Sequence, residues 1–171
     1  LSSSSAASDV YKRQDLDRFD IEILDILQKD NMTSQRDIGD KIGLSAAAVQ
    51  RRIKKMREEK VIRADISVIN PEEVASQILL FVEVDLDTDK IEFIDEIKNT
   101  FSQVPQVQQC YYVTGEVDFI LIMVVKSMQE YESLIRKLFL SNSNIRRFKT
   151  FVNMHTVKAG LQIPLPKKDF K

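Results

Sequence analysis

The sequence predicts an α+β protein in two parts: an amino-terminal three-helix (winged) helix–turn–helix domain and a carboxyl-terminal ferredoxin-like βαββαβ domain. Two observations predict this division. Apolar residues recur at helical spacing from residue 15 to about residue 63, and the pattern then changes to the alternation typical of strands. The 171 residues, of which 43% are hydrophobic and 30% charged, suffice for one ordinary domain or two small ones and exclude a wholly disordered chain.

Residues 1–14 are small, polar and aperiodic, and we expect a disordered tail or a non-native segment there. They contain no apolar core of a secretory signal. The longest unbroken apolar stretch, residues 119–125, is far shorter than the roughly 18 to 20 residues of a membrane-spanning helix. Together with the single cysteine, these features predict a cytoplasmic protein that does not enter a membrane.

Residues 15–63 are predicted to form three helices. The first ends near the turn-forming pair Asp30-Asn31, and the second begins at a cap, Thr33 or Ser34, and stops at Gly43. Ser45 is expected to cap the third helix, which runs to about residue 59. Its inward stripe is predicted to be Ala46, Val49, Ile53 and Met56.

Residues 64–76 are predicted to be a linker strand that Pro71 stops. Residues 77–160 show the order strand–helix–strand–strand–helix–strand, with a last strand expected over residues 145–157, and residues 161–171 form a carboxyl-terminal tail. Two helices on one face of a four-stranded antiparallel sheet are the ferredoxin-like arrangement. Cys110 lies in an apolar strand, and we expect it to be a buried small hydrophobe.

The third helix concentrates positive charge. Residues 46–63 hold seven Lys or Arg against two acids, in a protein whose formal net charge is −1. For an isolated amphipathic helix a solvated basic face is the simpler reading, but three small alanines at its start and the preceding glycine turn favour insertion into the DNA major groove. The predicted phosphate contacts are Arg51, Arg52, Lys54, Lys55 and Arg57, and the predicted base-edge contacts are Ser45, Ala46, Ala47 and Gln50.

The composition predicts no catalytic residue, metal or cofactor. One histidine, His155, and one cysteine exclude a multi-histidine metal centre and a zinc site of the CxxC…CxxC type. The four glycines form no GxGxxG or GxxxxGK fingerprint. The turn at residues 115–118, Gly-Glu-Val-Asp, has no nucleophile–base pair beside it. It is either a plain hairpin turn or a place where a carboxylate and backbone amides hold an amino acid.

The ordered part of the chain, residues 16–165, resembles the leucine-responsive/asparagine regulator (Lrp/AsnC) family. LDRFDIEILDILQKD, DIGDKIGLSAAAVQRRIKKMREEKVI and the strand ending Ile69-Asn70-Pro71 resemble its amino half. VTGEVDFIL and FKTFVNMHTVK resemble its ligand-sensing domain. The chain departs from the family in the first turn of the third helix, where members often carry Pro or Thr and this chain has Ala46-Ala47-Ala48; this departure affects the operator sequence and not DNA binding itself.

The resemblance implies homodimers joined through their sheets and linker strands, often assembled further, with small molecules bound between dimers near the Gly-x-x-Asp turn. The effector contacts that it implies are Gly115, Glu116 and Asp118, with Thr150, Phe151 and Val152 nearby.

The sequence therefore predicts a sequence-specific DNA-binding transcriptional regulator, not an enzyme, whose partners are double-stranded DNA, an effector such as an amino acid, and further copies of itself. One alternative is an enzyme of the siroheme decarboxylase type, which resembles these regulators; the single histidine and the basic helix argue against it. The other is an effector-independent DNA-organising protein, which a footprint with and without amino acids distinguishes.

Overall fold

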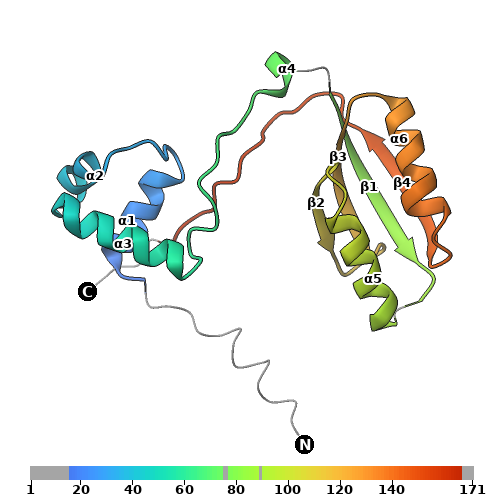
Figure 1. Cartoon of the computed structure of the whole chain (residues 1–171), viewed down its shortest axis with the longest axis horizontal. Coiled ribbons are helices and arrows are strands. Elements are labelled where there is room, and N and C mark those ends of the chain that lie inside the picture. The colour runs from blue at the N-terminus through green and yellow to red at the C-terminus, as the bar shows by residue number, and fades with distance from the viewer. Residues whose placement is uncertain (1–15, 75–76, 89, 167–171) are drawn as a thin grey trace, which may run out of the picture. The chain divides into compact units, whose positions relative to one another are not determined.

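The structure is a computed structural model that describes residues 16–74, 77–88 and 90–166 (Figure 1). It divides the chain into two compact units: residues up to 67 together with those from 159 onward, and residues 68–158. The first boundary falls inside the predicted linker, residues 64–76. The predicted tail at residues 1–14 lies outside the described residues, as do the last five residues of the predicted segment 161–171.

The first unit contains three helices, α1 (Arg18–Leu27), α2 (Gln35–Ile42) and α3 (Ala46–Glu58). Each begins at a capping side chain, Asp17, Ser34 or Ser45, which accepts a hydrogen bond from the backbone amide three residues later. The helices pack their apolar stripes into one core. The fully or almost fully buried members of that core are Ile23, Ile38, Val49, Ile53 and Met56. Ala46, predicted on the inward stripe, is exposed because it lies in the first turn, beyond this core.

A tight turn fixes α3 relative to α2. Gly43 has a left-handed backbone with φ +75°, and its amide donates to the Gly39 carbonyl at 2.9 Å. The Leu44 amide donates to the same carbonyl at 3.0 Å. A Cβ on Gly39 would lie 2.3 Å from the Leu44 carbonyl oxygen, so only glycine allows this approach.

The predicted linker strand is not found. Residues 64–70 form no strand, and Pro71 begins a short helix, α4 (Pro71–Val74), instead of ending a strand. A strand needs a neighbour to complete its hydrogen bonds, whereas proline suits the first position of a helix because its missing amide is unpaired there anyway. The described part of this unit also contains no strand that could form a wing.

The carboxyl-terminal segment, which belongs to the first unit, is hydrogen-bonded to the end of α1. The side-chain amide of Gln28, at the end of α1, donates to the Ile163 carbonyl at 3.2 Å, and its oxygen accepts from the Ile163 amide at 3.1 Å. One side chain thus satisfies both backbone groups of a residue far away in the sequence.

The second unit is a four-stranded antiparallel sheet of β1 (Ile78–Leu86), β2 (Val107–Tyr112), β3 (Phe119–Val125) and β4 (Ile145–Val152). The strands are ordered β2-β3-β1-β4, and every pair is antiparallel. β4 ends at Val152 and not at residue 157. The predicted ferredoxin-like α+β fold is confirmed.

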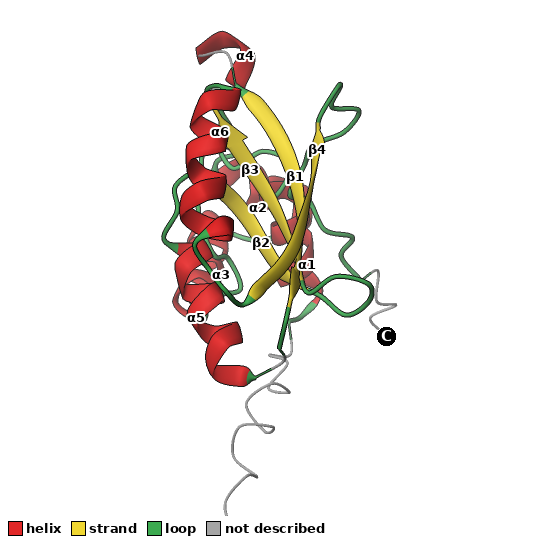
Figure 2. Ribbon diagram, turned by 90° about the vertical axis from the view of Figure 1, so that its right-hand side faces the viewer, coloured by secondary structure: helices red, strands yellow, loops and turns green. Residues whose placement is uncertain are grey.

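Two helices, α5 (Ile91–Ser102) and α6 (Met128–Ile135), cover one face of this sheet (Figure 2), and a π-helical turn, η2 (Arg136–Leu140), continues α6. Between sheet and helices lies the second core, in which Phe101 meets Phe119 and Phe139 edge to face. Among the described residues of this unit, no element covers the other face, where Phe81 on β1 lies opposite Ile122 on β3 and Phe151 on β4. On the edge strand β2, Tyr111 lies opposite Ile120 of β3.

Candidate functional site

The amino-terminal end of α3 presents small and polar side chains to solvent. Ser45, Ala46, Ala47 and Gln50 are all exposed, while Val49 is fully buried beneath them. The Ser45 hydroxyl caps the helix by accepting from the Ala48 amide at 3.2 Å. The predicted base-edge residues therefore share one accessible, slim helix end, which is the shape that a major groove admits.

Four of the five cations predicted to contact phosphate lie on the exposed side of α3 or at its end. Arg51 is exposed and forms no ion pair with any residue that the structure describes. Lys54 and Lys55 are 77% and 70% exposed, in loose pairs of 3.8 Å with Glu58 and 3.9 Å with Glu59. Such pairs along an exposed helix contribute only about 0.3–0.5 kcal/mol, so a phosphate can displace them.

Arg57 is held more firmly. Its Nε lies 2.8 Å from Asp65 Oδ2. This ion pair joins the end of α3 to the start of the segment that leaves this unit. Both side chains remain partly exposed.

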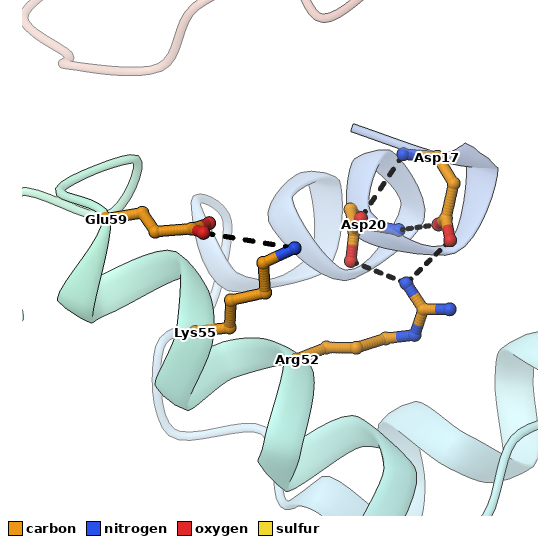
Figure 3. A network of polar contacts seen from close by, with 5 residues as sticks. All are labelled: Asp17, Asp20, Arg52, Lys55 and Glu59. Atoms are coloured by element: carbon orange, nitrogen blue, oxygen red, sulfur yellow. Dashed lines mark hydrogen bonds and ion pairs between the residues drawn. The ribbon is translucent and has the colours of Figure 1, made fainter. Parts of the chain in front are cut away.

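Arg52 differs from its neighbours, as Figure 3 shows. Its Nη1 lies 2.7 Å from Asp17 Oδ2 and 2.8 Å from Asp20 Oδ1. Its guanidinium also sits over the Phe19 ring at 5.5 Å from the centroid. The two carboxylates also cap α1 reciprocally, each accepting from the other residue's backbone amide. Only 27% of the Arg52 side chain is exposed.

The charges of this cluster stabilise one another. Partial burial alone would raise the pKa of Asp17, but the hydrogen bond from the Asp20 amide and the Arg52 guanidinium outweigh it and hold that pKa below its ordinary value. The hydrogen bond to Asp20 is the main cause that raises the pKa of Arg52. The sequence pattern did not reveal this cluster, although two aspartates three residues apart at a helix start are the signal of a cap.

The Gly-Glu-Val-Asp turn joins β2 to β3. Gly115 has φ +142°, a backbone conformation that favours glycine, and nothing lies within 4 Å of a Cβ placed there. Asp118 Oδ2 accepts from the Leu86 amide at 2.8 Å, and the Asp118 amide donates to the Val84 carbonyl at 3.0 Å. The turn is thereby fixed to the end of β1, and Glu116 is exposed.

The structure does not bring the six predicted effector residues together within one chain. Thr150 and Val152 pair with Val82 and Leu80, whereas the turn contacts β1 at Val84 and Leu86, two to six residues further along, or roughly 7–20 Å along the strand. The Thr150 hydroxyl is hydrogen-bonded to the Tyr131 hydroxyl on α6. Phe151 and Val152 are 41% and 50% exposed.

An acid that the sequence reasoning missed lies next to an open cavity in this unit. Asp85 in β1 is buried, with Arg147 Nη2 2.6 Å from its Oδ2. Residues of η2 and of early β4, including Arg146 and Arg147, line a cavity of about 420 Å³. An acid inside an apolar strand was the signal that could have indicated this ion pair.

The remaining candidates hold no metal-binding arrangement. His155 is exposed beyond the end of β4, and within the described ranges no three His, Cys, Asp or Glu side chains are grouped so as to hold a metal ion. Cys110 is exposed and not buried as expected, because β2 is an edge strand. None of the helices in the described part of the chain is both long and apolar enough to cross a membrane.

Comparison with known proteins matches both units. The AsnC-type helix-turn-helix domain matches residues 16–57, and the Lrp/AsnC ligand-binding domain matches residues 79–163. An HTH-type transcriptional regulator of Sinorhizobium fredii, itself uncharacterized, is 40% identical over 88% of this chain and 89% of its own length.

Two solved structures are similar over most of the chain. An AsnC family transcriptional regulator from Agrobacterium tumefaciens is 30% identical, with a TM-score of 0.79 over 87% of this chain and 97% of that one. A transcriptional regulator from Neisseria meningitidis, in complex with L-methionine, is 21% identical, with a TM-score of 0.78 over 87% of this chain and 96% of that one. With both of its units matched and a close relative covering most of its length, the chain belongs to the Lrp/AsnC family of transcriptional regulators.

Proposed function

We propose that this protein regulates transcription as a homodimer or larger assembly that inserts α3 into the major groove of double-stranded DNA and responds to an amino acid. The observation that carries the proposal is the exposed amino end of α3, followed by Arg51, Lys54 and Lys55 on accessible faces. Base edges are read by Ser45, Ala46, Ala47 and Gln50, and phosphates are bound by the cations. This role places the protein in the cytoplasm.

The uncovered face of the sheet supports dimerisation. Phe81, Ile122, Phe151 and Tyr111 are half-buried or exposed there, and this is the kind of apolar patch that a second copy covers. A two-fold dimer presents two copies of α3 and therefore favours a pseudo-palindromic operator.

The effector site is proposed at the Gly-Glu-Val-Asp turn. Asp118 supplies a carboxylate for the ammonium of a zwitterion, and the turn amides beside Gly115 face its carboxylate. Since Thr150, Phe151 and Val152 lie farther along the sheet, they complete the site only if a second copy contributes them. The L-methionine complex of the Neisseria relative supports an amino acid as the ligand class.

The experiment is a thermal-shift screen of the purified protein against the twenty amino acids, followed by a footprint on the DNA upstream of its own gene. A ligand that binds only the native state raises the melting temperature by mass action. We expect one or a few amino acids to raise it and to alter the footprint. A footprint that no amino acid changes would favour the DNA-organising alternative. No binding to this DNA or to any genomic fragment would contradict the proposal that the protein is a regulator rather than an enzyme.

A further inference from the structure

We propose that Arg52 is a positioning residue that fixes α3 against the start of α1, and that it does not contact phosphate as the charge pattern alone predicts. The inference rests on the proposed function, because it concerns how the DNA-reading helix is held.

The side chain is held at one guanidinium nitrogen and across one face of the guanidinium. Its Nη1 donates to Asp17 at 2.7 Å and to Asp20 at 2.8 Å (Figure 3). Its guanidinium also lies over the Phe19 ring. The position of Arg52 on α3 explains why its side chain points toward α1, since residues three or four apart share a helix face. Arg52 follows the buried Val49 and precedes the buried Met56, so it borders the core, where α1 packs.

Electrostatics keep it there. Asp17 and Asp20 together carry two negative charges near a helix that must approach the DNA backbone. If Arg52 left them to bind a phosphate, both carboxylates would face the polyanion without their cation. A phosphate would offer Arg52 charge-assisted hydrogen bonds of the same kind as the two that it already makes, and moving to it would leave two carboxylates unpaired, so the arrangement favours Arg52 staying with its two acids.

The cluster also connects two structural features of the unit. Asp17 and Asp20 form the capping box that begins α1, and Arg52 lies on α3 between its amino end and its cationic last turns. The same contacts therefore fix both where α1 starts and how α3 is oriented. Arg51, one residue earlier, is exposed and without an ion pair to any described residue, which makes it the matched control.

The test is the salt dependence of binding to a short random-sequence DNA duplex, measured by fluorescence anisotropy on full-length Arg52→Ala, Arg51→Ala and wild-type protein. Losing a phosphate contact reduces the log–log salt slope by about 0.9 per subunit, or about 1.8 per dimer. We expect Arg51→Ala to show that change. Arg52→Ala should weaken binding at least threefold and leave the slope within about 0.3 of wild type. Equal flattening in both variants would overturn the inference.

A second pair of variants keeps the inference testable if Arg52→Ala does not fold. Asp20→Asn weakens the ion pair with Arg52 and leaves the arginine itself unchanged. Glu22→Gln removes the same charge from α1 at a residue that does not contact Arg52. A positioning role predicts that Asp20→Asn binds DNA more weakly than Glu22→Gln at an equal slope. Tighter binding with a steeper slope in Asp20→Asn would show that Arg52 is a phosphate ligand. A wild-type slope near zero would instead reject the proposed function itself.

Discussion

Replacing Asp118 by Ala and by Asn separates two roles of one carboxylate. Its Oδ2 accepts from the amide of Leu86, a buried residue, at 2.8 Å, and so ties the turn to the end of β1. Ala leaves that amide without a partner, which costs about 1–3 kcal/mol of the free energy of unfolding. For a unit of this size each kcal/mol lowers the melting temperature by about 4–8 °C, so we expect a fall of roughly 4–24 °C.

Asn at position 118 retains an oxygen that accepts from the Leu86 amide but removes the negative charge. We therefore expect a fall in melting temperature of less than about 4 °C for Asp118→Asn. Losing a charge-assisted hydrogen bond to the ligand ammonium costs about 1.5–3 kcal/mol, so both variants should bind the effector roughly ten- to a hundredfold more weakly.

The assays are scanning calorimetry for stability and titration calorimetry with the amino acid found in the screen. Unchanged effector affinity in Asp118→Asn would show that the carboxylate serves only the turn. An unchanged melting temperature in Asp118→Ala would refute the stability argument made from the Leu86 hydrogen bond.

Three further predictions concern the helix turn, the sheet face and the charge cluster. Gly39→Ala should lower the free energy of unfolding of the first unit by about 1–3 kcal/mol in a urea titration, because the added Cβ would lie 2.3 Å from the Leu44 carbonyl oxygen. Gly43→Ala is strained only by the φ of +75° at that position, and it should lower the same free energy by about 1–2 kcal/mol. Ile122→Glu should sediment as a monomer or a smaller assembly than wild type, because it places a charge on the sheet face that a second copy covers; an unchanged sedimentation coefficient would exclude that face as the interface. The pKa of Asp17 lies below its ordinary value of 3.8, so the ionised carboxylate stabilises the fold at pH values above 3.8. This stabilisation is lost as the pH falls through the lowered pKa. In acid titrations followed by circular dichroism, Asp17→Asn should lack this pH-dependent loss of stability.

Local chemistry made the helices predictable. Ser45 followed by the apolar positions Val49, Ile53 and Met56 marks where α3 begins and which face it buries, and the structure confirms both. Gly43 ends α2 as predicted, since its left-handed backbone favours glycine.

The two wrong predictions, and the acidic partners of Arg52 that the sequence did not reveal, depend on neighbouring elements that a sequence does not identify. Cys110 was expected to be buried, but β2 lies at the sheet edge, and strand order cannot be inferred from alternation alone. Residues 64–70 alternate like a strand, yet without a pairing partner in one chain they form none. Arg52 matches its basic neighbours in charge, and only the packing of α1 against α3 reveals its acidic partners.

The most direct test of DNA binding by α3 compares two charge-matched double variants over about 50–200 mM KCl. Arg51→Ala/Lys54→Ala removes exposed cations from α3, and Arg136→Ala/Lys137→Ala removes two exposed cations from η2 in the other unit. With six or more phosphates neutralised per dimer, wild type should show a log–log slope of about −5 or steeper. The α3 variant should lose about 3 to 4 of that slope, and the η2 variant should keep it. Equal slopes in the two variants would contradict the account.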